Sequence, residues 1–323
     1  MDHKQGLIIL NLIISLCLVG IILHFVGIRE VVNEISSVNI FYLFLALISL
    51  FLMDIVMSYR IGLLLEELGI HLSFLAILKS HFVGMLLADF TPSRTGYFAT
   101  AAVLRYNYEV PSEKALLSIF GPQIFDFAFK LVAGSLAMFY VLFVFIGSDK
   151  GWILIGGAFV LAIIIGLMLL VLFSKSFLKM FSFIDGLPLL SKFYNVIVRM
   201  QENSHVVVKK TPHLLLLIFL SWFFRSISWY LVAKSVGITL QLGFPEPVFY
   251  FFLQPLVTML EFVPSPTIAG LGLSEGGTTL VFSLFGVLPA KATLFALLAR
   301  FKTTFLHLSA VPEALAVPKA IKL

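Results

Sequence analysis

The sequence predicts an all-α integral membrane protein with about six full transmembrane spans and two re-entrant helical hairpins, arranged as an inverted repeat. Hydrophobic residues make up 60% of the 323 residues and charged residues only 12%, whereas a soluble domain is about half apolar and about a quarter charged. Apolar runs recur along the whole chain, and proline and glycine interrupt two stretches of it at matching places. Because no polar linker divides the chain, we expect a single transmembrane domain over residues 1–323.

The apolar runs define the expected helices in chain order. A helix needs about 20 residues to cross the membrane, and the runs expected to cross are 7–26, 40–59, 115–146, 152–173, 213–233 and 292–311. The first run has no small-x-small cleavage site, so we expect an uncleaved helix rather than a signal peptide. The run 115–146 exceeds one span, and Gly121-Pro122 is expected to break it because proline starts a helix more readily than it continues one.

Loop charges predict the orientation. The longest polar stretch, 174–211, carries Lys175, Lys179, Lys192, Arg199, Lys209 and Lys210, and the positive-inside rule makes it a cytoplasmic amphipathic connector. If 74–104 dips into the membrane and returns, the basic residues before and after it also fall inside. The same argument makes 247–288 a hairpin that is entered from outside. We therefore expect a multi-pass plasma-membrane protein with both termini in the cytoplasm.

Two parts of the chain resemble each other. Repeat 1 is expected at about 40–146 with its hairpin at 74–104, and repeat 2 at about 212–311 with its hairpin at 247–288. The segment Asp89-Phe90-Thr91-Pro92-Ser93 parallels Glu261-Phe262-Val263-Pro264-Ser265, and a Lys-Ala pair follows each hairpin. The first unit begins outside and the second inside, which is the inverted-repeat construction of many transporters.

The helix breaks inside these hairpins predict a binding site. Broken backbone is tolerated in lipid only where it lines a cavity or is buried in protein, and the free N–H groups at a half-helix start attract phosphate or carboxylate. Arg94 would add a charge-assisted donor. A kink without a ligand is the alternative. The candidate substrate-binding residues are Pro92, Ser93, Arg94, Gly96, Pro264, Gly270, Gly272 and Glu275. We expect Arg94 and Glu275 to line one central cavity together with Gly270 and Gly272.

Charged residues within apolar runs form a second candidate set, because each is costly in hydrocarbon unless it faces protein or water. Asp89 and Glu261 lie at the expected C-terminal ends of half-helices, where the helix dipole disfavours an anion. Arg225 and Arg300 are their expected partners. Static pairing is preferred over the alternative that either acid couples to a proton gradient. The candidate gating or charge-pairing residues are Asp89, Asp126, Arg225, Glu261 and Arg300.

The segment from Pro264 to Gly276, with two glycines and a Glu-Gly pair after its prolines, resembles the signature of a flippase-like membrane family. The best-known member region of that family is the transmembrane part of bacterial lysylphosphatidylglycerol synthases. Residues 92–96 resemble the first motif of the family. The chain departs from the usual residues of the first motif at Ser93 and Tyr97 and from those of the second at Ser274. The resemblance implies movement of lipids or lipid-linked sugars between leaflets. The synthases also carry a large soluble aminoacyl-transfer domain, whereas here only a short tail that ends with Lys319 to Leu323 follows the last apolar run, so lipid aminoacylation is not expected.

The preferred hypothesis is a transporter or flippase-like protein for an anionic lipid or lipid-linked headgroup, not an enzyme and without a cofactor. The alternatives are an intramembrane lipid-modifying enzyme with Asp89, Glu261 or Glu275 as base, and an accessory membrane subunit of a lipid or glycan pathway that holds a glycosyltransferase partner. No His or Cys spacing fits a metal site. The dispersed basic residues do not form a nucleic-acid patch, so neither a metal nor a nucleic acid is expected.

Overall fold

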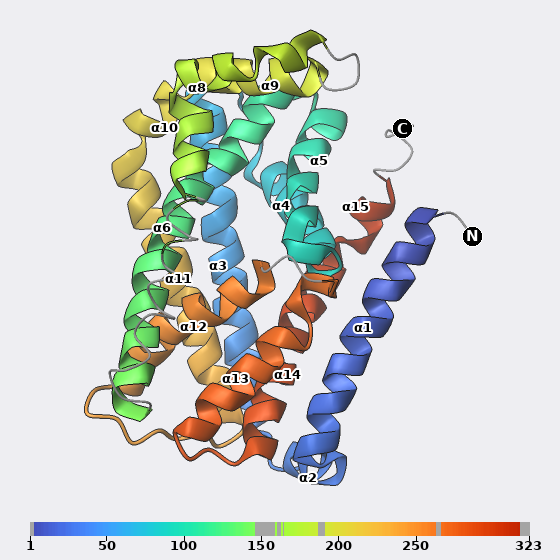
Figure 1. Ribbon diagram of the computed structural model, residues 1–323, viewed down its shortest axis with the longest axis vertical. Coiled ribbons are helices and arrows are strands. Elements are labelled where there is room, and N and C mark those ends of the chain that lie inside the picture. The colour runs from blue at the N-terminus through green and yellow to red at the C-terminus, as the bar shows by residue number, and fades with distance from the viewer. Residues whose placement is uncertain are drawn as a thin grey trace.

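The computed structural model describes residues 3–145, 159, 163, 165–186, 191–262 and 266–316, and within these ranges the secondary structure is entirely helical. The helices form an elongated bundle (Figure 1). Long, apolar helices that can cross a membrane are α3 (Ile40–Glu67), α6 (Ser112–Phe145), α11 (Thr211–Ser235) and α14 (Pro289–His307), the last continuing to Ala316. A fifth span would be α1 (His3–Val26) with α2 (Ile28–Ile35), which are bent by 88° at Gly27.

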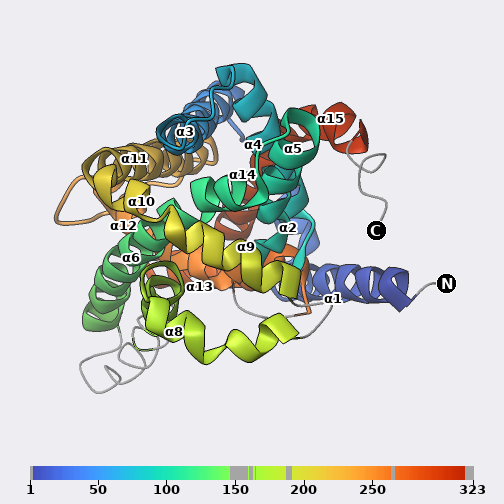
Figure 2. The same ribbon diagram turned by 90° about the horizontal axis from the view of Figure 1, so that it is seen from above.

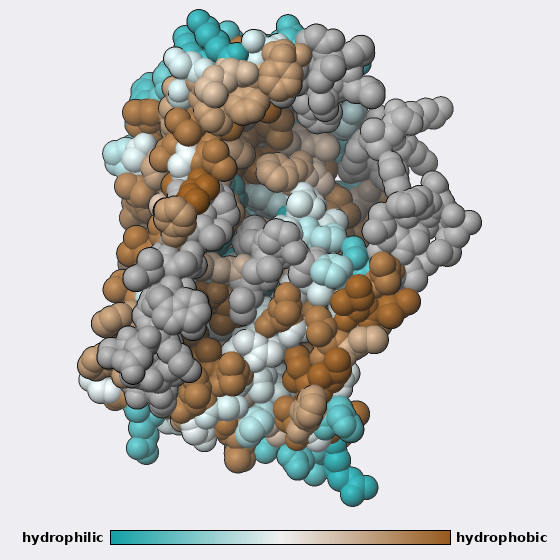
Figure 3. All heavy atoms as spheres, viewed as in Figure 1, coloured by the Kyte–Doolittle hydropathy of each residue, from teal (hydrophilic) through white to brown (hydrophobic). Residues whose placement is uncertain are grey.

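The prediction of an all-α, multi-pass membrane protein is therefore confirmed, with four or five apolar spans among the described residues. The expected span at 152–173 lies largely outside those residues. Hydrophobic side chains cover the sides of the bundle, and hydrophilic residues gather at its two ends (Figure 3). Phe25 is 83% exposed and Phe143 is 71% exposed. Apolar exposure on this scale is suited to lipid rather than to water.

Two helix–break–helix units lie in opposite halves of the bundle (Figure 1). The first consists of α4 (Phe74–Asp89), the 3₁₀ turn η1 (Pro92–Phe98) and α5 (Ala99–Tyr108), and α5 packs back against α4. The second consists of α12 (Glu246–Phe262), η4 (Ile268–Gly270) and α13 (Leu273–Leu284). Their tips meet in the middle of the molecule, where the Ala269 amide donates to the Thr91 carbonyl at 3.1 Å.

The long helices that precede the two units pair with each other. The Ser49 hydroxyl of α3 donates to the Phe224 carbonyl of α11 at 2.7 Å, and the Ser228 hydroxyl of α11 donates to the Ala46 carbonyl of α3 at 2.6 Å. Both helices end in the same way. Gly69 and Gly237 adopt φ values of +76° and +69°, and the next amide in each case reaches back to the last turn at 2.9 Å. A glycine in this conformation satisfies the final carbonyls of a helix.

Short helices close one end of the bundle. The connector runs through α8 (Lys175–Met180), η3 (Ser182–Gly186), α9 (Ser191–Glu202) and α10 (His205–Lys209). It lies across the helix ends in Figures 1 and 2. Lys209 and Lys210 both pair with Glu67 at the end of α3, and the Lys210 contact is 2.9 Å. After α14 the chain passes through η5 (Leu308–Ala310) into α15 (Val311–Ala316). The short helix α2 lies at the end of the bundle opposite the connector.

The expected break at Gly121-Pro122 is wrong, because α6 continues through Pro122. Neighbouring helices can offset the hydrogen bond that a proline removes inside a membrane helix. Gly121 has a packing role instead: a Cβ atom at this position would lie 2.7 Å from the Cγ2 atom of Val207 in α10. The pair therefore marks a close helix contact rather than a helix end.

We predict that Gly96→Ala destabilises the first tip. A Cβ atom on Gly96 would lie 2.3 Å from the carbonyl atoms of Leu87, so η1 would have to move away from α4. Overpacking of this kind costs about 1–3 kcal/mol. The thermal midpoint of the purified protein in detergent should fall, whereas Gly20→Ala, with no neighbour within 4 Å, should leave it unchanged. Equal midpoints for the two variants would contradict the observed packing.

Candidate functional site

The first tip is held in a left-handed turn. Ser93 and Arg94 have φ values of +52° and +56°, and Ala269 at the second tip has +46°. Residues with a Cβ atom rarely adopt this conformation, and it persists where the surrounding structure determines it. Arg94 is only 8% exposed. The turn at the end of α4 thus places a guanidinium group in the interior of the bundle.

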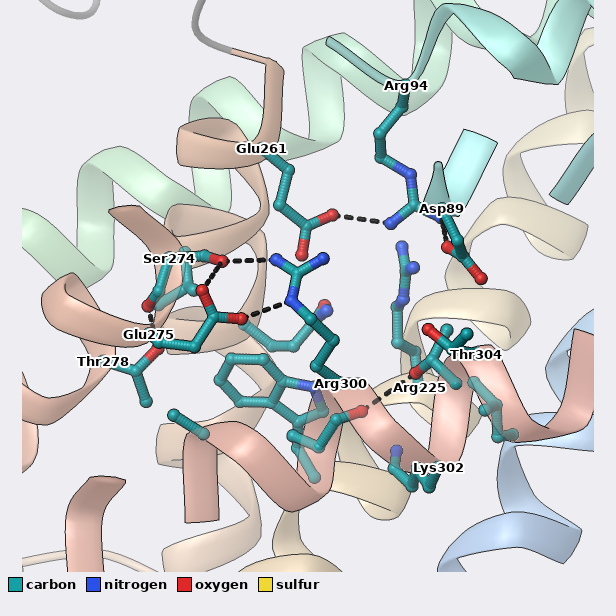
Figure 4. A pocket seen from close by; sticks show the side chains of 17 residues that line it. Asp89, Arg94, Arg225, Glu261, Ser274, Glu275, Thr278, Arg300, Lys302 and Thr304 are labelled. Carbon is teal, nitrogen blue, oxygen red and sulfur yellow. Dashed lines mark hydrogen bonds and ion pairs between the residues drawn. The ribbon is translucent and has the colours of Figure 1, made fainter. Parts of the chain in front are cut away.

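Arg94 joins the two units through a pair of ionic contacts (Figure 4). Its Nη2 atom lies 3.0 Å from Oδ1 of Asp89 at the end of α4, and its Nη1 atom lies 2.6 Å from Oε2 of Glu261 at the end of α12. We call this arrangement, Asp89–Arg94–Glu261, the central bridge. One cation therefore offsets two carboxylates at helix C-termini, where the helix dipole would otherwise repel them.

Arg300 of α14 organises the second tip. Its Nε atom contacts Glu275, and its Nη2 atom donates to the Ser274 hydroxyl at 2.7 Å and to the Ala269 carbonyl at 3.2 Å. The other carboxylate oxygen of Glu275 accepts from the Gly272 amide at 2.6 Å. Glu275 thereby caps the start of α13 and fixes Arg300 on the tip.

Two cavities adjoin the tips. The central cavity, of about 40 Å³, is the pocket drawn in Figure 4, and its charged lining residues are Asp89, Arg94, Arg225, Glu261, Glu275, Arg300 and Lys302. The side cavity, of about 230 Å³, is lined by polar and charged residues together with three methionines and three phenylalanines, Met57, Met85, Met168, Phe98, Phe120 and Phe127. Arg94 and Arg225 line both cavities, so the central bridge stands between them.

Two cations at the central cavity, the partly buried Arg225 and the buried Lys302, have no carboxylate partner within ion-pair distance among the described residues. Arg225 of α11 lies over the Trp222 ring at 5.4 Å, and its guanidinium group points toward those of Arg94 and Arg300 in Figure 4. Lys302 is 2% exposed, and its ammonium group donates to the Ser228 hydroxyl. A buried charge without a counter-ion is costly. The cavity is therefore prepared for an anion.

The charge partners differ from those expected. Asp89 and Glu261 share Arg94 rather than pairing with Arg225 and Arg300, and Arg300 instead contacts Glu275. The physical reason is the left-handed turn, which folds Arg94 back onto the acid five residues before it. Such a turn has no signature in hydropathy or charge spacing.

The other candidate residues divide by role. Arg94 and Glu275 line the central cavity as expected, but the expectation that Gly270 and Gly272 line it with them is wrong. Gly272 lies against α1, where a Cβ atom would come within 2.4 Å of Leu18. Ser93 lines the side cavity. Pro92 opens η1, Gly96 packs against α4, and Pro264 lies outside the described residues.

Asp126 belongs to a second buried charge cluster on α6. Its carboxylate lies 2.8 Å from Nζ of Lys130, one helical turn further on, and 3.9 Å from Nη1 of Arg60 on α3. The Trp222 indole donates to it at 2.9 Å. Asp126 and Lys130 also line the side cavity, so charged groups flank its apolar lining.

Sequence reasoning missed a chain of buried polar residues beside the central bridge. Asp54 of α3 contacts His81 of α4 at 3.1 Å and His307 of α14 at 3.5 Å, and His307 contacts Asp89 at 2.7 Å. The only available signal was that each residue lies in or beside an apolar run, since their positions in the sequence follow no motif.

A bundle of long apolar helices around a buried, charged centre defines a multi-pass membrane protein. The family model for the lysylphosphatidylglycerol synthase TM region matches residues 8–310, and the chain belongs to this family. The resemblance inferred from the sequence motifs is thus confirmed. No curated protein matches the chain. Within the described ranges, no group of three or more His, Cys, Asp or Glu residues could hold a metal ion.

We predict that Arg94→Gln strongly destabilises the protein, because it leaves Asp89 and Glu261 buried without their shared cation. Removing one partner of a buried ion pair costs about 3–5 kcal/mol. The triple variant Arg94→Gln/Asp89→Asn/Glu261→Gln should recover most of that loss, since no uncompensated carboxylate remains at the bridge. The thermal midpoint in detergent measures both the loss of stability in Arg94→Gln and its recovery in the triple variant. Exposed Arg105→Gln is the matched control, and a single variant as stable as this control would disprove the bridge.

Proposed function

We propose that the protein moves an anionic lipid, or a lipid-linked anionic headgroup, between the leaflets of the plasma membrane. The observation that carries the proposal is a cavity beside the meeting point of two helix breaks, lined by Arg225 and Lys302, which have no carboxylate partner within ion-pair distance among the described residues. Membership of a family named for a phosphatidylglycerol-modifying synthase supports a function connected with membrane lipids. The intramembrane location follows from the apolar helices that carry both groups.

The proposed architecture is an inverted repeat with two re-entrant hairpins. The α4–η1–α5 and α12–η4–α13 units lie in opposite halves of the bundle, and each follows a long helix with the same glycine-containing end. Asp89 and Glu261 end the first helix of each unit and contact the same arginine. These matches support two equivalent units of opposite orientation, in which one central site can face either leaflet.

The two cavities suggest how an amphiphile is accommodated. A phosphate would meet Arg225 and Lys302 in the central cavity, since neither is offset by a carboxylate. An acyl or isoprenoid chain would occupy the side cavity, which offers methionine and aromatic side chains. Because Arg94 and Arg225 line both cavities, the headgroup and the chain of one lipid could be bound on either side of this pair.

The central bridge would act as the gate. The central cavity, of about 40 Å³, is much smaller than a typical small-molecule pocket of about 300–1,000 Å³. A headgroup can therefore enter only if the tips separate. A phosphate that competes for Arg94 would weaken its contacts to Asp89 and Glu261, and it would favour the open state because it binds that state more tightly.

We predict that Arg225→Gln slows lipid movement with little loss of stability, because the substitution removes a cation that no ion pair requires. Protein reconstituted into liposomes should move a fluorescent phosphatidylglycerol between leaflets, as measured by dithionite quenching. Loss of one charge-assisted contact of about 1.5–3 kcal/mol should slow transport roughly 10- to 100-fold. Exposed Arg199→Gln on the connector is the matched control.

Several outcomes would contradict the transport proposal. If the wild-type protein moves no anionic lipid, phosphatidylglycerol and isoprenoid phosphates included, while a glycosyltransferase of the same membrane loses activity without it, the accessory-subunit hypothesis replaces transport. If the lipid is chemically altered instead, the intramembrane-enzyme hypothesis does. Equal rates for Arg225→Gln and Arg199→Gln would remove Arg225 from the site.

We also predict the topology. In a Cys17→Ser background, Cys replacing Lys192 on the connector should react only with a membrane-permeant maleimide, whereas Cys replacing Gln241, in the loop at the opposite end of α11, should react with an impermeant one. The basic connector is expected inside by the positive-inside rule, and both positions are exposed. The opposite labelling pattern would reverse the proposed orientation, including that of the termini.

A further inference from the structure

Four titratable residues form a buried cluster, of which the transport proposal uses only Asp89. Asp54, His81, Asp89 and His307 come from α3, α4 and α14, and we call them the His–Asp cluster. Asp54, His81 and His307 have no exposed surface, and Asp89 is 7% exposed. The cluster ends at the central bridge, because Asp89 uses Oδ2 for His307 and Oδ1 for Arg94. Anything that moves Arg94 therefore acts directly on the cluster.

The contacts of His307 determine its proton content. Its Nδ1 atom lies 2.7 Å from Asp89 Oδ2, and its Nε2 atom lies 3.5 Å from Asp54 Oδ2. A neutral imidazole donates from only one nitrogen, and a carboxylate can only accept. Nδ1 makes a hydrogen bond with Asp89, whereas Nε2 has no hydrogen-bond partner and lies only at ion-pair distance from Asp54. Because a carboxylate lies near each nitrogen, we assign His307 as an imidazolium. His81 needs only one proton, because its Nε2 atom faces Asp54 at 3.1 Å and its buried Nδ1 atom has no partner.

The charges of the cluster then depend on Arg94. Two carboxylates and one imidazolium leave a net charge of −1, which the Arg94 guanidinium, shared with Glu261, offsets through its contact with Asp89. When Arg94 turns to another anion, the cluster is left at −1 in a buried setting. An uncompensated buried charge is normally removed by a change of protonation. The vacated Asp89 Oδ1 atom is the nearest acceptor for that proton.

Charged and titratable groups face the cluster from several elements. Arg94 and Tyr97 approach from η1, Arg225 from α11, Glu261 from α12, Arg60 from α3, and Arg300 and Lys302 from α14. Among the described residues outside the cluster, only Arg94 lies within ion-pair distance of one of its carboxylates. Lys302 donates to Ser228 and Arg225 faces the central cavity, where an incoming phosphate would offset their charge.

A cavity at the edge of the bundle lies near the cluster. The Phe82 ring lies against His307 with 5.7 Å between ring centres. Phe82 also lines a cavity of about 220 Å³ at the edge of the bundle, which the Lys79–Glu313 ion pair borders. One aromatic side chain thus separates His307 from a cavity lined by charged residues.

We propose that the His–Asp cluster is a proton-binding site coupled to the anionic substrate: one proton enters the cluster when the substrate phosphate draws Arg94 away from Asp89. The proton comes from a buffer acid or hydronium ion, forms an O–H bond at Asp89 Oδ1, and leaves the conjugate base or water in solution. It is released when Arg94 returns. The inference rests on the proposed lipid-binding function and adds a proton-coupled step to it.

The test counts protons during lipid binding by the full-length protein. Binding of a short-chain phosphatidylglycerol to protein in zwitterionic nanodiscs is measured by calorimetry in buffers of different ionisation enthalpy. Uptake of about one proton per lipid is expected. By linkage, the apparent Kd should rise as the pH rises, by up to about tenfold per pH unit wherever lipid binding takes up one proton.

Asp54→Asn changes the cluster without changing the lipid site, because Asp54 contacts neither Arg94 nor the central cavity in the described structure. With Asp54 neutral, Asp89 and His307 balance each other after Arg94 leaves, so no proton should be taken up and the Kd should not vary with pH. Exposed His205→Gln should behave as the wild type. If Asp54→Asn does not fold, Asp89→Asn is the substitute. It should also take up no proton on lipid binding, because Asp54 and His307 then balance each other's charge.

The outcomes distinguish the two proposals. Lipid binding by the wild type without proton uptake would overturn the coupling and leave the transport function intact. Uptake that persists in Asp54→Asn and in Asp89→Asn would place the proton elsewhere and also overturn it. Absence of lipid binding in the wild type would refute the proposed function, and the coupling with it.

Discussion

The contact of one arginine with two acids holds the centre of this protein together. Arg94 lies between Asp89 and Glu261, which end the first helix of each helix–break–helix unit. Each acid alone would face the negative end of its own helix, and each break leaves backbone groups to be satisfied away from water. The central bridge, with the backbone bond between Ala269 and Thr91, resolves both difficulties at the same place. The two breaks therefore stabilise each other.

Close packing makes this meeting possible. Glycine at positions 96 and 272 lets η1 approach α4 and lets α1 approach the second tip. The Ser15 hydroxyl of α1 also accepts from the Ile268 amide at 2.8 Å. Arg300 reaches the same tip from α14. Long helices thus serve as a frame that supplies hydrogen-bond partners to a short irregular segment, as is required for backbone that is broken at membrane depth.

The charge distribution gives the centre two sides with different chemistry. Toward the central cavity, Arg225 and Lys302 are cations without carboxylate partners in the described part of the chain, which favours an anion. Toward α3 and α4, Asp54, Asp89 and two histidines form a buried cluster of titratable groups. Arg94 and Asp89 are in contact at the boundary, and both line the central cavity. Membership of the lysylphosphatidylglycerol synthase TM family agrees with a lipid-facing role, and the charges describe how such a role could be carried out.

The sequence by itself determined the class of protein, the family and the position of most long helices, because hydropathy is a local property and about 20 apolar residues suffice to indicate a span. It also located the breaks at Pro92 and around Gly270, since proline and glycine act on their own backbone. Only the tertiary structure decided which charges meet. Arg94 reaches Glu261 across 167 positions, and His307 reaches Asp89 across 218. Such pairs depend on a left-handed turn and on the mutual packing of five helices, and neither leaves a periodic pattern along the chain.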